Sequence, residues 1–145
     1  MSEIATKTVG CAGQLPAFLA MPATDTKGPA IVLMHESYGL VQHTRDLATR
    51  FARDGFVAIA PDFFHQHPDQ AALHRGDVGY DMTDPEAVGH LDAAISELAA
   101  LPQVDQSKIA VMGVCQTGRH PLILAAQRTV LVAISDIAAK RVSVG

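Results

Sequence analysis

Short runs of apolar residues, separated by turn-forming residues, recur along this chain and predict buried strands. The runs are Leu15–Met21, Ala30–Met34, Phe56–Ala60, Ile109–Val114 and Val130–Ile134. A continuous apolar run rich in β-branched residues is typical of a strand whose two faces are both covered, as in a parallel sheet. The pattern therefore predicts a buried, largely parallel sheet.

The segments between these runs show helical spacing of apolar residues. Helices are predicted at Thr44–Asp54, which is followed by Gly55, at Asp84–Ala100, with Asp84 as N-cap, and at Pro121–Arg128. Alternation of strands and helices predicts an α/β fold, a mostly parallel sheet with helices on both faces, in a single domain over residues 1–145. The polar segment His65–Asp84 is long for a connection and is predicted to be a functional loop.

Composition excludes several classes of protein. The chain has 145 residues, of which 48% are hydrophobic and 18% charged, with a net charge of -4. This composition does not fit a disordered chain, and the absence of a basic block argues against nucleic-acid binding. No apolar run approaches the roughly 20 residues of a membrane span, and the N-terminus does not resemble a signal peptide. We therefore expect a cytoplasmic protein that binds neither nucleic acid nor membrane.

Polar residues follow three of the predicted strands at the point where each strand ends. They lie in His35–Gly39, Pro61–Phe64 and Gly113–Gly118. The carboxyl ends of parallel strands share one edge of a sheet, and this edge is where such folds place their chemistry. We expect the three segments to converge there.

The third segment has the layout of a nucleophile elbow, a sharp strand-to-helix turn that exposes a nucleophile. Cys115 follows a strand, Gly113 supplies the small residue two positions earlier, and a helix is predicted after Gly118. Thr117 departs from the pattern, which calls for a very small residue there. The pattern alone leaves two interpretations open: a reactive thiol, or an inert cysteine buried at a strand end.

Several segments together, in their order and spacing, resemble the dienelactone hydrolase family over roughly residues 15–128. They are His35–Leu40, Arg45–Ala48, Gly55–Phe64 and Val104–Cys115. The resemblance implies the N-terminal portion of an α/β-hydrolase fold, without metal or organic cofactor. It also implies that Cys115 is the nucleophile and that Glu36 activates it. The backbone N–H groups of Ser37 and Gln116 would form the oxyanion hole.

Glu36 has an alternative interpretation as a cap on the following helix. In the family, the catalytic acid and histidine come after later strands. Downstream of Cys115 this chain offers only Asp136 and His120, and we expect His120 to face solvent. Without an oriented imidazole, hydrolysis of an acyl-enzyme should be slow.

Other residues carry weaker signals. His35 is expected to shape the oxyanion loop rather than to act as a base. The imidazoles at positions 65, 67 and 74 have metal-ligand chemistry, but a solvated loop is the preferred interpretation and no metal site is predicted. Arg75 could pair with a substrate carboxylate, although a surface arginine is equally ordinary. Cys11, in a turn-like glycine segment, is expected to be a packing residue.

Two functions follow from these patterns. The first is a hydrolase that cleaves an ester or lactone of a small molecule through Cys115. The alternative is a catalytically incomplete domain that acts as a binding or assembly module. The predicted sheet ends near a central strand of the implied fold, and an open strand edge favours a homo-oligomer.

Overall fold

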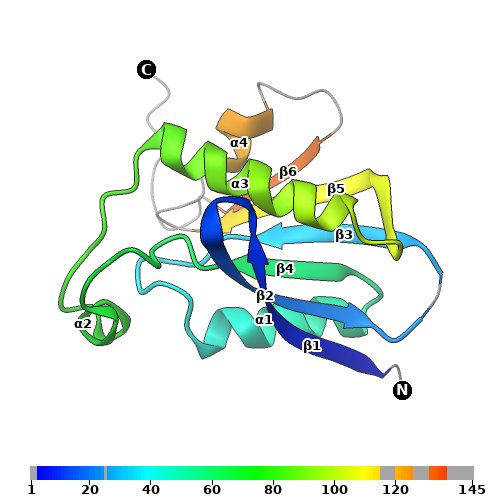
Figure 1. The fold of residues 1–145 in the computed structure, drawn as a ribbon, viewed down its shortest axis with the longest axis horizontal. Coiled ribbons are helices and arrows are strands. Elements are labelled where there is room, and N and C mark those ends of the chain that lie inside the picture. The colour runs from blue at the N-terminus through cyan, green and yellow to red at the C-terminus, as the bar shows by residue number, and fades with distance from the viewer. Residues whose placement is uncertain (1–2, 25, 115–119, 126–130, 137–145) are drawn as a thin grey trace.

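The computed structural model describes residues 3–24, 26–114, 120–125 and 131–136. Within these residues, six strands form one sheet in the order β1-β2-β4-β3-β5-β6 (Figure 1). The strands are β1 (Ile4–Cys11), β2 (Leu15–Pro22), β3 (Gly28–Leu33), β4 (Val57–Pro61), β5 (Val104–Val114) and β6 (Leu131–Asp136). The α-helices are α1 (Gln42–Arg53), α2 (Gln70–Arg75), α3 (Asp84–Ala99) and α4 (His120–Ala125).

The central strands are parallel, as predicted. β4, β3, β5 and β6 pair in parallel, whereas β1 pairs with β2, and β2 with β4, in antiparallel fashion. The carboxyl ends of the four parallel strands therefore lie along one edge of the sheet. The segments that follow β3, β4 and β5 all begin at that edge.

Helices cover both faces of the sheet, which confirms the predicted layers (Figure 1). In β3, Ile31 and Leu33 belong to the same core cluster as Ala48 of α1. Val32 belongs to the other cluster, with Leu91 of α3. Successive strand residues point to opposite faces, so an apolar run without alternation is what a sheet covered on both faces requires.

The structure adds elements that the apolar pattern did not predict. β1 is an edge strand whose residues are mostly exposed, so it has no apolar run to reveal it. Cys11 is the last residue of this strand rather than part of a turn.

The predicted loop between residues 65 and 84 contains α2. Asp69 caps this helix by accepting a hydrogen bond from the Ala72 N–H at 3.0 Å, and Gly76 ends it in the left-handed conformation. At the start of α3 the N-cap is Thr83, one residue before the predicted Asp84. None of the helices in the described residues is long and apolar enough to span a membrane.

Candidate functional site

His35 lies two positions after the end of β3, and its side chain joins two segments at the carboxyl edge of the sheet. Its side chain is fully buried, and both ring nitrogens are engaged. Nε2 accepts a hydrogen bond from the Phe63 N–H at 3.0 Å, and Nδ1 lies 2.7 Å from the Glu36 carbonyl oxygen. A backbone N–H can only donate, so the ring proton must reside on Nδ1 and be donated to Glu36.

His35 therefore ties the end of β3 to the end of β4 as a neutral imidazole. Burial lowers its pKa, and the rings of Phe63 and Phe64 meet it edge-on at centroid distances of 5.5 and 4.6 Å. If Nε2 were protonated, its N–H would face the Phe63 N–H, and two donors would oppose each other. This geometry supports the prediction that His35 shapes the loop at Glu36 and does not act as a base.

Glu36 stands at the carboxyl edge with its side chain half-buried. Its backbone carbonyl also accepts a hydrogen bond from the Gly39 N–H at 3.3 Å, which closes a turn. The N-cap of α1 is Val41, and no side chain caps this helix. The helix-capping interpretation of Glu36 is therefore wrong. Its carboxylate makes no hydrogen bond or ion pair with the described residues.

A small cavity adjoins Glu36, between the loop after β3 and the first turn of α1. Its volume is about 170 Å³, and it is lined by Glu36, Tyr38, Val41, His43 and Thr44. Residues that carry a carboxylate, a phenol and a hydroxyl group thus line one space at the carboxyl edge of the sheet.

Of the two predicted oxyanion donors, Ser37 lies within the described residues and Gln116 lies outside them. Ser37 is half-buried, and its N–H has no acceptor among the residues that the structure describes. Cys115 and Gln116 lie outside them, as does Thr117. β5 (Val104–Val114) is the described element that precedes Cys115 in the sequence.

An aromatic and acidic cluster covers the end of β4. The Tyr80 hydroxyl donates a hydrogen bond of 2.5 Å to Glu86, and this bond raises the pKa of Tyr80 to about 12. The Tyr80 ring packs on Phe64 at 4.9 Å. His90 Nε2 lies 3.9 Å from Glu86, and its ring is 5.8 Å from that of His65.

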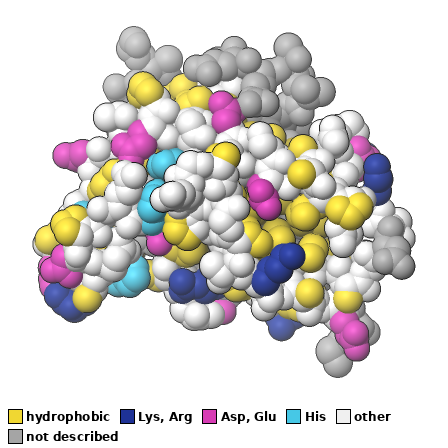
Figure 2. Space-filling model, viewed as in Figure 1, with side chains coloured by type: hydrophobic (Ala, Val, Ile, Leu, Met, Phe, Trp, Pro, Cys, Tyr) yellow, Lys and Arg dark blue, Asp and Glu magenta, His cyan; other side chains and the backbone are white. Residues whose placement is uncertain are grey.

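Burial lowers the pKa of His90. Histidine side chains gather on the left of the face shown in Figure 2. This cluster could not be predicted from the sequence, because its only signal there is one tyrosine six residues before a glutamate in the first turn of α3.

Arg75 and His67, which carried weaker signals in the sequence, do not line the cavity beside Glu36. Arg75 ends α2 and forms an exposed ion pair with Asp77 at 2.9 Å. His67 Nδ1 accepts a hydrogen bond from the Asp69 N–H at 3.0 Å. In the described parts of the chain, no three side chains of metal-ligating type gather closely enough to hold an ion.

His120 is buried, which contradicts the expectation that it faces solvent. Only 2% of its surface is exposed, and its Nε2 lies 3.3 Å from an Asp84 carboxylate oxygen. The reason is helix packing: α4 contacts α3, so the first residue of α4 meets the first residue of α3. The sequence shows only that His120 precedes a proline, and this does not reveal its contact with Asp84.

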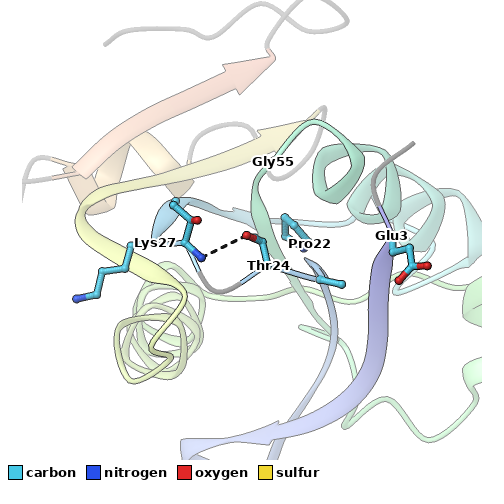
Figure 3. A pocket seen from close by; sticks show the side chains of 8 residues that line it. Glu3, Pro22, Thr24, Lys27 and Gly55 are labelled. Atoms are coloured by element: carbon cyan, nitrogen blue, oxygen red, sulfur yellow. Dashed lines mark hydrogen bonds between the residues drawn. The ribbon is translucent and has the colours of Figure 1, made fainter.

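A larger hollow, of about 510 Å³, lies at the opposite edge of the sheet (Figure 3). Pro22, Thr24, Lys27 and Gly55 line it, where β3 and β4 begin. The Thr24 hydroxyl accepts a hydrogen bond from the backbone N–H of Thr26 at 3.3 Å and so closes the turn. None of the predicted catalytic residues lines this hollow.

Comparisons with known proteins agree with the fold. The sequence profile of the Dienelactone hydrolase family matches residues 15–135. A protein of Methylorubrum extorquens named "Putative carboxymethylenebutenolidase" is 29% identical over 119 residues, which are 79% of this chain and 41% of that protein. The chain spans less than half the length of the curated relatives it matches.

Solved structures show the same architecture. A "Putative Dienelactone Hydrolase" from Klebsiella pneumoniae superposes with a TM-score of 0.74 at 26% identity, over 92% of this chain and 59% of that one. A dienelactone hydrolase-like promiscuous phosphotriesterase from metagenomic libraries gives a TM-score of 0.71 at 26% identity, over 90% and 57%. With the family profile spanning β2 through most of β6, this chain belongs to the dienelactone hydrolase family.

Proposed function

We propose that this protein hydrolyses an ester or lactone bond of a small molecule, with Cys115 as the nucleophile and Glu36 as the group that takes its proton. Membership of the dienelactone hydrolase family supports the reaction class. Several curated relatives are named as carboxymethylenebutenolidases, and one as a lactonase, which supports a lactone among the substrates.

The observation that carries this proposal is the register between β3 and β5. These strands are parallel neighbours, and Ala30 pairs with Ile109 and Leu33 with Met112, an offset of 112 − 33 = 79 positions. Glu36 and Cys115 are separated by the same 115 − 36 = 79 positions. Both residues come three positions after the last pair in the sequence, and the carboxyl ends of neighbouring parallel strands share one edge of a sheet. The pairing therefore supports a shared site for the carboxylate and the thiol.

The proposed chemistry follows from these groups. Glu36 accepts the thiol proton, and the sulfur of Cys115 attacks the carbonyl carbon. The N–H groups of Ser37 and Gln116 stabilise the oxyanion. Collapse of the tetrahedral intermediate breaks the C–O bond, and the leaving alkoxide takes the proton from Glu36 to become the alcohol. The thioester that remains is hydrolysed by water to the free acid, which restores the thiol. The Ser37 N–H, with no acceptor among the described residues, is available for this role.

Three further expectations belong to the proposal. Arg75 would bind a substrate carboxylate only by exchanging its partner Asp77. Association of identical copies is supported by the low charged fraction of 18%, which leaves little charge to solvate the surface. A cytoplasmic location is also proposed, because two cysteines are too few for a disulfide framework.

The experiment is a pre-steady-state burst assay with 4-nitrophenyl acetate. Wild type should release one equivalent of nitrophenolate rapidly and then turn over. Cys115→Ala should abolish the burst, whereas Cys11→Ala, which removes the other thiol, should retain it. Glu36→Gln should slow the burst by roughly 10²–10⁴-fold.

The alternative, a binding or assembly module, predicts a different result. A stoichiometric burst without turnover, or no burst, would favour the module over the hydrolase. A burst that survives Cys115→Ala would exclude Cys115 as the nucleophile.

A further inference from the structure

Thr44 is a largely buried residue whose hydroxyl group is available to a ligand. Among the described residues, the buried polar side chains are His35, Thr44 and His120. His35 is bonded at both ring nitrogens, and His120 faces Asp84. Thr44 is only 5% exposed, yet its hydroxyl makes no hydrogen bond with any described residue. The hydroxyl oxygen is not among the fully buried polar atoms that lack a partner, so it is open to the cavity that Thr44 lines and can donate to a ligand there.

The surroundings of Thr44 point to a ligand that accepts hydrogen bonds. Thr44 lies in the first turn of α1 and lines the cavity beside Glu36. The N-cap, Val41, offers no side-chain acceptor to the helix. The backbone N–H groups of Gln42 and His43 have no acceptor among the described residues. A hydroxyl and two backbone donors thus lie at one end of a helix, beside a single cavity.

We propose that this cavity is a substrate subsite that binds an uncharged oxygen, such as a ketone or ether, through the Thr44 hydroxyl and the start of α1. The inference rests on the proposed hydrolase function only in naming the occupant as part of the substrate. A volume of about 170 Å³ admits a small group. At roughly 30 Å³ for each water, it corresponds to about six such molecules.

The preference for an uncharged group comes from Glu36, which lines the same cavity. A helix N-terminus carries the equivalent of about half a positive charge, whereas a carboxylate carries a full negative one. An anionic ligand would therefore meet net repulsion, and a neutral oxygen would not. A substrate oxygen that displaces a bridging water loses little when it reproduces the hydrogen bond of that water.

The first test is a binding measurement on the full chain by protein-observed NMR. Three matched probes are used: 4-oxopentanamide, pentanamide, which has CH₂ in place of the ketone, and succinamate, which carries a carboxylate. The ketone should bind roughly three- to tenfold more tightly than pentanamide, the range expected of one neutral hydrogen bond. It should also bind more tightly than succinamate, and shift the resonances of residues 42–44.

Variants at position 44 then locate the effect. Thr44→Val keeps the shape but removes the hydroxyl, and it should lose the preference for the ketone. Thr44→Ser should keep that preference. Thr49→Val, on the same helix, removes a hydroxyl that bonds to the Arg45 carbonyl and does not line the cavity, so it should leave the preference unchanged.

The second test compares kcat/KM for 4-nitrophenyl 4-oxopentanoate and 4-nitrophenyl pentanoate. The ratio should favour the oxo ester by the same factor. Equal binding of ketone and pentanamide to wild type, or a preference that survives Thr44→Val, would overturn the subsite. If the amides bind as expected but neither ester is hydrolysed, the subsite stands and the proposed hydrolase function fails.

Discussion

Replacing His35 with leucine tests whether one buried imidazole holds the ends of β3 and β4 together. The substitution removes the acceptor of the buried Phe63 N–H and one of two donors to the Glu36 carbonyl. An orphaned buried N–H costs about 1–3 kcal/mol, and loss of a satisfied hydrogen bond costs about 1 kcal/mol more. We expect His35→Leu to lower the free energy of unfolding by about 2–4 kcal/mol at pH 7.5.

The same variant should change the pH dependence of stability. Burial lowers the pKa of His35 in the folded protein, so as the pH falls below about 6.5 the unfolded chain takes up a proton that the folded chain does not. Stability from this group is thus complete above that pH and is lost on acidification. The loss is at most about 1.4 kcal/mol between pH 7.5 and 5.5. The lowered pKa of His90 acts in the same direction.

Urea unfolding at pH 7.5 and at pH 5.5 provides the measurement. Wild type should lose more stability between the two conditions than His35→Leu does, because the variant lacks the contribution of His35. His43→Gln removes an exposed histidine outside this network and serves as the control. If His35→Leu loses as much stability on acidification as wild type, the neutral-imidazole argument is refuted.

Two predictions concern other groups with shifted pKa values. Ultraviolet titration should show a tyrosine that ionises near pH 12. Tyr80→Phe should remove this step, and Glu86→Gln should move it to lower pH. An unchanged titration in Glu86→Gln would contradict the hydrogen bond between the two residues. Burial raises the pKa of Cys11 to about 11, so in Cys115→Ser only about a thousandth of the remaining thiol is ionised at pH 8. It should react with 5,5′-dithiobis(2-nitrobenzoate) slowly when native and quickly in urea; fast reaction of the native protein would show that Cys11 is accessible.

Local sequence determined the layers of this protein. Runs such as Ala30–Met34 and Phe56–Ala60 are apolar at every position, and only strands covered on both faces bury such runs completely. The chemistry-bearing segment at His35–Gly39 could also be recognised, because residue types at strand ends are visible without knowing the contacts. β1 escaped prediction because an exposed edge strand carries no apolar run.

Tertiary structure decided which side chains meet. His120 and Asp84 are 36 positions apart, and only the packing of α4 on α3 brings them within 3.3 Å. The hydroxyl of Thr44 and the carboxylate of Glu36 share a cavity because a turn at Gly39 folds the loop back onto α1. Periodicity reports which face of an element is buried, since that depends on neighbours along the chain. Partners across elements depend on packing distances, which no local pattern contains.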